Sequence, residues 1–204
     1  FEQKRIHILV GTQMVVKGLD FEHVQLVGIL DADSLLSFAE FRVNERAFQM
    51  MEQVSGRAGR KGEKGQVLIQ VANISHPVIN FLLQHNYKGF YDFEIEGRQK
   101  FQYPPFTRLI QLVFRHKDKA TVEAAAHWFA DEMRKNGFDN RYLKGPSEPV
   151  INRIRNQYLM EILLKLPKKS NVILHCKKTI REATAKMHNI QNFRSVIVIP
   201  EVDK

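Results

Sequence analysis

Residues 53–70, QVSGRAGRKGEKGQVLIQ, combine the end of a helix, a glycine-rich turn and the start of a buried strand. Residues 42–54 carry apolar side chains at a spacing of about 3.6, which predicts an amphipathic helix before the turn. The apolar run at residues 66–72 predicts a strand after it, and residues 6–10 and 24–30 predict two more strands upstream. Short buried strands that alternate with helices are typical of a parallel α/β sheet.

The second half of the chain follows a different order. After Pro104 and Pro105, the pattern predicts a strand, a helix, two strands, a helix and a last strand. These elements are expected at residues 108–115, 120–135, 141–153 (a loop and a strand), 158–166, 171–189 and 196–199. The βαββαβ order predicts a small ferredoxin-like α+β domain. Because a residue before proline disfavours helical backbone, we predict a first domain at residues 1–103 and a second at residues 104–204.

The net charge of the chain lies entirely in its second half. Residues 1–100 hold 12 Lys+Arg and 12 Asp+Glu, whereas residues 101–204 hold 19 and 10, which accounts for the whole +9. A basic domain favours polyanions, of which nucleic acid is the foremost. The single cysteine, Cys176, excludes a disulfide framework, and no apolar run approaches the ~20 residues of a membrane span. We therefore expect a cytoplasmic protein with no membrane partner.

The glycine-rich turn presents two arginines, Arg57 and Arg60, separated by small residues. The planar guanidinium donates several hydrogen bonds to phosphate oxygens and keeps its charge. An arginine directed at a transferring phosphoryl group stabilises the negative charge of the transition state. The alternative interpretation is a basic turn on the protein surface.

A second phosphate-binding pattern, GTQMVVKGLDF at residues 11–21, follows the first predicted strand. A glycine and a hydroxyl side chain at the start of a helix present backbone N–H groups to a phosphate. The alternative is an ordinary capped helix, with Thr12 as its N-cap and Gly18 as its C-terminal stop.

Together the two segments resemble motifs V and VI of superfamily-two helicases, which occur in this order on the second RecA-like lobe. The stretches GTQMVVKGLDF, LDADSLLSFAEFRVNERAFQ and QVSGRAGRKGEKGQVLIQ resemble the bacterial primosomal protein N′ family of replication-restart DNA helicases. The resemblance runs from about residue 6 to residue 70 and continues weakly to the Tyr103-Pro104-Pro105 corner. The family's C-terminal domain is likewise a βαββαβ unit. Ala39 and Glu40 replace the family's usual proline and aspartate, which keeps the acid and affects the local turn.

The resemblance implies an ATP site built partly from motif VI. Arg60 matches the arginine finger that reaches the γ-phosphate across the cleft between the lobes, and Arg57 matches its companion. Gln53, on the preceding helix, would lie near the same nucleotide. The family therefore implies ATP and Mg²⁺ in the full-length enzyme.

Motif V, by the same resemblance, couples the nucleotide to DNA. Thr12 matches the hydroxyl that contacts a nucleic-acid phosphate. Gly18 and Asp20 match the motif V glycine and the acid placed near the ribose of the nucleotide.

Two features of such enzymes do not occur in this chain. It contains no G-x-x-x-x-G-K-[ST] phosphate loop, so we expect the fragment alone to hydrolyse no ATP. Its histidines and single cysteine show no zinc-binding spacing, so we expect no metal site here. The family carries zinc in an insertion upstream of motif V, and we expect the chain to begin after that insertion.

Basic side chains of the second half are candidate DNA contacts. The set comprises Arg153, Arg155, Lys168, Lys169, Lys177, Lys178 and Arg181. Clustered cations neutralise several phosphates and release counterions, although a solvated face that keeps a small domain soluble has the same composition. The Asp131-Glu132 pair lies within a predicted amphipathic helix, and we interpret it as a solvated helix face.

We interpret the chain as the C-terminal part of an ATP-dependent 3′-to-5′ DNA helicase, comprising part of the second RecA-like lobe and a basic α+β domain. The resemblance implies action at stalled replication forks, primosome assembly, and contact with branched and single-stranded DNA, the single-stranded-DNA-binding protein and other primosome proteins. It also implies a bacterial, nucleoid-associated location. Two alternatives remain: another superfamily-two helicase that acts in branch migration or on RNA, and a non-catalytic module that binds fork DNA.

Overall fold

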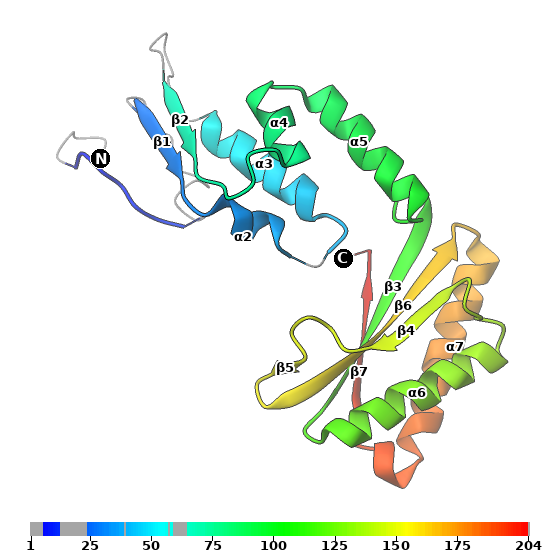
Figure 1. The fold of residues 1–204 in the computed structure, drawn as a ribbon. Helices are drawn as coiled ribbons and strands as arrows, with labels where there is room; N and C mark the ends of the chain where they lie inside the picture. The colour runs from blue at the N-terminus through cyan, green and yellow to red at the C-terminus, as the bar shows by residue number, and fades with distance from the viewer. Residues whose placement is uncertain (1–5, 13–23, 39, 57, 59–64, 204) are drawn as a thin grey trace. The chain divides into compact units, whose positions relative to one another are not determined.

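The computed structural model describes residues 6–12, 24–38, 40–56, 58 and 65–203. The chain forms two compact units, Phe1–Glu96 and Gly97–Lys204 (Figure 1). The units divide inside helix α5 (Tyr87–Lys100), earlier than the proline corner at which we placed the boundary. The corner after α5 is bonded to the second unit, since the Lys165 ammonium donates to the Phe101 carbonyl at 2.8 Å.

The first unit contains a parallel pair of strands covered by helices. Strands β1 (Leu26–Ile29) and β2 (Gln66–Ile69) pair in parallel along their whole length, as the α/β pattern predicts. Helix α3 (Val43–Ser55) packs against β1 and contacts α2 (Ala32–Leu36) and α4 (Pro77–Leu83). The rings of Phe48 and Phe90 stack with centroids 4.3 Å apart. The buried core of this unit comprises Ala32, Ala47, Phe48, Met51, Val78, Ile79, Leu82 and Phe90.

The strand predicted at residues 6–10 is not formed. These residues make no strand in the structure, and the side chains of Ile8 and Val10 are 79% and 85% exposed. An apolar run becomes a strand only where a neighbouring strand supplies its hydrogen bonds. Among the described residues of this unit only β1 and β2 pair with each other, so the prediction for residues 6–10 is wrong for this structure.

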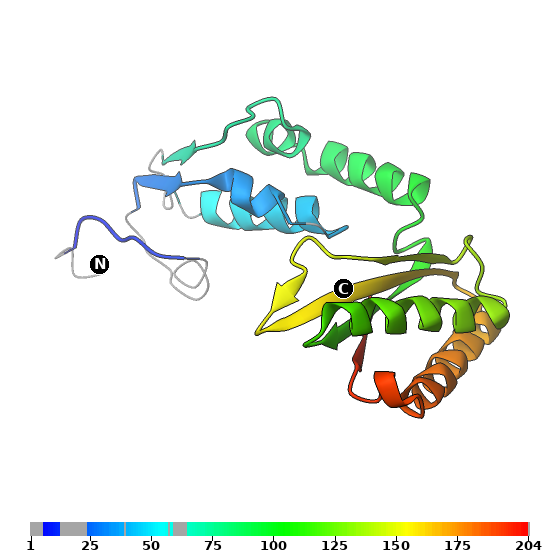
Figure 2. The same ribbon diagram turned by 60° about the horizontal axis from the view of Figure 1, so that its bottom comes forward.

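The second unit has the predicted βαββαβ order with one short extra strand (Figures 1 and 2). Its elements are β3 (Thr107–His116), α6 (Lys119–Lys135), β4 (Leu143–Ser147), β5 (Arg153–Ile154), β6 (Gln157–Pro167), α7 (Ser170–His188), the short helix η2 (Gln191–Phe193) and β7 (Ile197–Val202). The sheet has the order β4-β6-β3-β7, every pair is antiparallel, and β5 pairs with β6. This strand order confirms the ferredoxin-like α+β prediction.

Helices α6 and α7 cover one face of this sheet (Figure 2). Alternate residues of β3 and β6, among them Leu112, Phe114, Ile162 and Leu164, are fully buried beneath them. Each helix begins after a short connection, and Asp118 caps α6 by accepting a hydrogen bond from the Thr121 amide at 2.8 Å. The second unit therefore has a core of its own.

Both edges of the sheet contain proline. In the edge strand β4 the register shifts between Lys144 and Ser147, around Gly145 and Pro146. Gly145 has φ +93°, and a Cβ there would lie 2.8 Å from the Glu161 carbonyl oxygen, so a side chain does not fit. The other edge strand, β7, carries Pro200 opposite Leu112.

Strands β5 and β6 form a hairpin closed by Arg155 and Asn156. Ile154 pairs with Gln157 and Arg153 with Tyr158. Arg155 and Asn156 have φ values of 48° and 63°. Two central residues with positive φ form the tight turn that fits the twist of a hairpin, although the conformation is unfavourable for arginine.

Candidate functional site: nucleotide and nucleic-acid contacts

Helix α3 leads into the glycine-rich turn. Ala47, Phe48 and Met51 bury one side of the helix, whereas Gln53 in its last turn is exposed. The helix ends at Ser55, and the Gly56 amide donates to the Glu52 carbonyl at 2.9 Å. Gln53 is thus exposed at the helix end from which the GRAGR segment continues.

Most of the predicted nucleotide residues lie outside the described part of the chain. These are Arg57, Arg60, Gly18 and Asp20. Thr12 is described and exposed, in a segment without regular secondary structure. The roles of these residues and of Gln53 stay predictions, because a contact with any of the four lies outside what the structure describes.

The acids around β1 and α3 have structural partners. The Asp33 carboxylate accepts a hydrogen bond from the Ala72 amide at 2.7 Å, which ties α2 to the segment that follows β2. Glu40, the acid retained where the sequence departs from the family pattern, pairs with Arg46 at 2.5 Å. Both contacts position helices of the lobe.

The candidate DNA contacts of the second unit separate into two groups. Lys168 and Lys169 lie just before α7, and Lys177, Lys178 and Arg181 lie on its exposed side. We call these five residues the α7 cation face. The other two, Arg153 and Arg155, belong to the hairpin at the opposite end of β6. An eleven-residue strand spans roughly 35 Å at about 3.3 Å per residue, so the seven side chains do not form one patch.

Most acidic side chains of the second unit form ion pairs with cations that are not among the candidate DNA contacts. Glu148 pairs with Lys119 at 2.5 Å, Asp131 with Arg134 at 2.8 Å, and Asp139 with Arg141 at 3.0 Å. Asp203 pairs with Arg108. On the α7 cation face, Lys178 has Glu182 at 3.8 Å, whereas the other four cations have no ion pair with an acid in the described part of the chain. Their positive charge is therefore available to an external anion.

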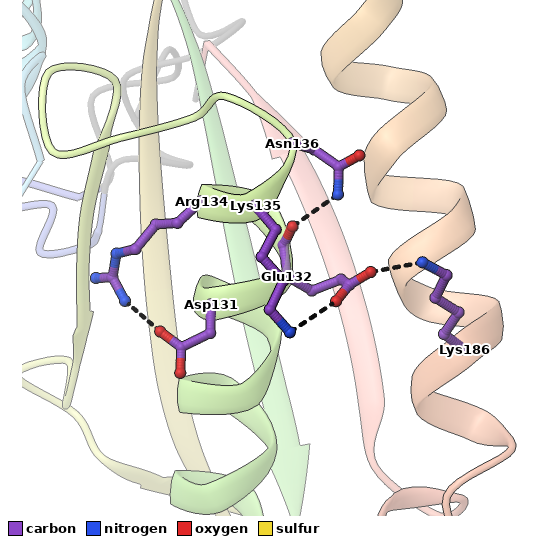
Figure 3. Close-up of polar contacts among 6 residues, drawn as sticks. All are labelled: Asp131, Glu132, Arg134, Lys135, Asn136 and Lys186. Atoms are coloured by element: carbon purple, nitrogen blue, oxygen red, sulfur yellow. Dashed lines mark hydrogen bonds and ion pairs between the residues drawn. The ribbon is translucent and has the colours of Figure 1, made fainter.

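Glu132 connects the two helices (Figure 3). Its carboxylate lies 2.5 Å from the Lys186 ammonium of α7 and 3.5 Å from Lys135 of its own helix. The hydrogen bond from Lys186 lowers the pKa of Glu132, and the same bond raises the pKa of Lys186. The side chain of Glu132 is 12% exposed and that of Asp131 is 63% exposed. The prediction of a solvated acidic face is therefore right for Asp131 and wrong for Glu132.

Two further features of the second unit were not predicted from the sequence. Lys165 in β6 lies 3.6 Å from the centre of the Tyr103 ring, and burial, followed by the charge of Lys144, lowers the pKa of Lys165. Before β5, Val150 and Ile151 are exposed, on a segment in which we predicted only a loop and a strand. A local signal existed in the sequence, since PVINRIRN places apolar residues next to arginines within a turn-rich stretch.

Within the described ranges, no three His, Cys, Asp or Glu side chains lie close enough together to hold a metal ion. No helix in those ranges is both long and apolar enough to cross a membrane.

The fold and the family comparisons agree on a class of protein. Residues 1–62 match the family model of the helicase conserved C-terminal domain, which places the first unit among the helicases. Residues 99–203 match the family model described as the primosomal protein N C-terminal domain. The chain belongs to the primosomal protein N family, as the sequence resemblance indicated.

Relatives from several bacteria carry one name, replication restart protein PriA. The protein from Synechocystis is 41% identical over 174 residues, which are 85% of this chain and 21% of that protein. The Bacillus subtilis protein is 38% identical over 181 residues, 88% of this chain and 22% of its own length. The Haemophilus influenzae protein is 33% identical over 183 residues, which are 89% of this chain and 24% of that protein. The chain thus spans about a fifth to a quarter of these relatives.

Proposed function

We propose that this chain is the C-terminal part of an ATP-dependent 3′-to-5′ DNA helicase that acts at stalled or repaired forks and restarts replication by primosome assembly. The match of its two units to a helicase domain and to the primosomal protein N domain carries the proposal. The name that these relatives share, replication restart protein, supports restart as the process. The match also favours this family over the branch-migration or RNA helicase alternative.

The nucleotide part of the proposal rests on motif VI and the end of α3. In the full-length protein Arg60 and Arg57 would contact the γ-phosphate, with Gln53 beside them and Gly18 and Asp20 near the ribose. The exposure of Gln53 at the end of α3 is compatible with this arrangement. The guanidinium groups would stabilise the negative charge that develops on the phosphoryl group during hydrolysis. Mg²⁺ and the phosphate loop would come from other parts of the protein, and so would zinc.

The DNA part of the proposal rests on charge. Thr12 would contact a backbone phosphate in the lobe, and the α7 cation face would hold DNA without reading its sequence, because lysine and arginine bind phosphates of any sequence. Branched and single-stranded DNA are the proposed substrates. The single-stranded-DNA-binding protein and other primosome proteins are the proposed partners, in the bacterial cytoplasm at the nucleoid.

Replacement of Arg60 by alanine in the full-length protein tests the catalytic part. ATP turnover should fall by ~10³-fold or more, as when an arginine finger is removed from a phosphoryl-transfer site. Nucleotide affinity should fall much less, because the contact is strongest in the transition state. Lysine should restore little activity, since its ammonium group does not reproduce the planar fork of arginine. Gln53→Ala should be milder than Arg60→Ala.

The control for this experiment is the present chain. Without a phosphate loop it should hydrolyse no ATP, and any residual turnover that survives Arg60→Ala is a contaminant. Wild-type turnover by the full-length Arg60→Ala protein, combined with weaker DNA binding, would contradict the catalytic assignment. It would favour the alternative of a non-catalytic fork-binding module, in which the GRAGR segment faces DNA.

A further inference from the structure

The segment that leads into the β5–β6 hairpin exposes apolar side chains. This segment, strand β5 and the turn, residues 149–156, are together called the hairpin tip below. Val150 and Ile151 are 85% and 64% exposed, and Ile154 is 40% exposed. Scattered exposed aliphatic residues are common, but three within five positions of one loop form a local apolar surface.

The hairpin tip is held in place by its own contacts. The Leu159 amide donates to the Asn152 carbonyl at 2.8 Å, and the Asn152 side-chain amide donates to Glu148 at 2.8 Å. Glu148 in turn pairs with Lys119 at the start of α6. The apolar side chains are therefore carried on a loop that is anchored to the folded unit at several points.

Arginine flanks the apolar side chains. The Arg153 guanidinium lies over the Tyr158 ring, 4.9 Å from its centre, and donates a hydrogen bond to Asn156. Arg155 occupies a turn position with φ 48°, where glycine or asparagine is favoured. Neither guanidinium group is neutralised by a described acid, so both can bind an anion beside the apolar side chains.

A partner that fits the hairpin tip must offer anionic groups next to an exposed apolar face. The interior of a DNA duplex is stacked, but the last base pair at a junction with single strands has one uncovered face, flanked by phosphates of both strands. Proteins place aliphatic side chains against such unstacked base faces, and they hold the adjacent phosphates with arginine. A duplex without a junction offers the phosphates alone.

We propose that the hairpin tip binds the junction between double-stranded and single-stranded DNA. Val150 and Ile151 lie against the terminal base pair, and Arg153 and Arg155 bind phosphates on either side of it. The α7 cation face, at the other end of β6, binds the duplex backbone. This inference rests on the proposed DNA-binding function and assigns fork recognition to a separate site.

Val150→Ser/Ile151→Ser in the 204-residue chain tests the assignment. Fluorescence anisotropy at one salt concentration gives affinities for a fork, a blunt duplex and a single strand of matched length. The double variant should bind the fork roughly tenfold more weakly, because the burial of two aliphatic side chains against the base pair no longer contributes to binding. Its duplex affinity should stay within about twofold of wild type, since the phosphate contacts are kept.

A control variant and two further measurements accompany the affinities. Ile74→Ser, which changes a side chain 70% exposed in the first unit, is the matched control and should leave fork binding unchanged. 2-Aminopurine in the last base pair of the fork should change its fluorescence with the wild-type chain and remain unchanged with the double variant. Equal urea midpoints for all three proteins establish that the substitutions leave the fold intact.

The possible outcomes distinguish a failure of the hairpin-tip assignment from a failure of the proposed DNA-binding function. If the double variant keeps wild-type affinity for the fork, the assignment of the hairpin tip to the DNA junction is wrong. A hairpin tip that binds a protein partner instead would give this result. A wild-type chain that binds fork and duplex equally overturns the assignment as well, while the proposed DNA binding stands. A wild-type chain that binds none of the three DNAs at low salt refutes both.

Discussion

Replacing Lys177 and Arg181 by alanine tests whether the α7 cation face binds DNA. The two residues are separated by one helical turn and are exposed on α7. Neither side chain pairs with an acid among the described residues, so its removal leaves no acidic group unpartnered. The double substitution should therefore change binding without changing the stability of the fold.

The expected magnitude follows from counterion release. Each phosphate contact contributes about −0.9 to the slope of log Kobs against log salt on duplex DNA, so two lost contacts make that slope shallower by about 1.8. If the wild-type chain and the variant have equal affinities near 1 M salt, this difference in slope makes the variant bind about 60-fold more weakly at ~0.1 M salt. On single-stranded DNA, where each contact contributes about −0.7, the loss is about 25-fold.

The assay is anisotropy of a labelled 20-base-pair duplex titrated with the 204-residue chain at several salt concentrations. Arg46→Ala/Lys88→Ala is the matched control, because it removes the same two charges from exposed, ion-paired positions of the first unit. A slope that changes equally in both variants would show that net charge alone governs binding. An unchanged slope in Lys177→Ala/Arg181→Ala would show that the α7 cation face is a solvated surface.

Two further predictions concern the second unit. Burial raises the pKa of Cys176 to about 12, so a thiolate-directed reagent should label the folded chain slowly at pH 8 and the urea-unfolded chain completely. Stability should also fall as the pH rises above 9.0, the ordinary pKa of the thiol, because only the unfolded chain then releases the proton. Lys186 holds the pKa of Glu132 below its ordinary 4.5, so the ion pair stabilises the fold above that pH and is lost as the pH falls through the lower, folded value. Glu132→Gln should lower the urea midpoint at pH 7, and a difference from wild type that did not shrink on acidification would contradict this role.

The second unit could be predicted well because its signals are local. In β3, residues such as Leu112 and Phe114 alternate with half-buried Gln111 and Val113, and this period of two fixes which face meets the helices. The capped helix α6 begins one residue before its predicted start. Each of these elements can be recognised without knowledge of its neighbours.

The first unit was harder to predict because pairing is not local. Residues 6–10 have the apolar composition of β1, yet only β1 has a described partner strand. Sequence composition indicates what a strand would bury, whereas the position of the neighbouring chain decides whether the strand forms.

Nearness in sequence also misled the interpretation of the basic residues. Arg155 and Lys168 are close in the sequence, but the extended β6 between them carries them to opposite ends of the sheet. Glu132 shows the opposite case, in which a residue far away in the sequence is a partner in the fold. It follows Phe129 by three residues, so the helix places it at the border of the buried face, where Lys186 of another helix reaches it. A border position of this kind cannot be distinguished from a solvated one without the partner helix.

The prolines and the glycine at the sheet edges affect how the protein behaves when it is crowded. A free strand edge is a template on which a second molecule can add its own strand, and aggregation begins in this way. Pro200 removes an amide from β7, and the irregular turn at Gly145 and Pro146 bends β4 away from a straight ladder. Molecules that meet at high local concentration therefore find no straight, fully bonded edge on this sheet to which a further strand could pair.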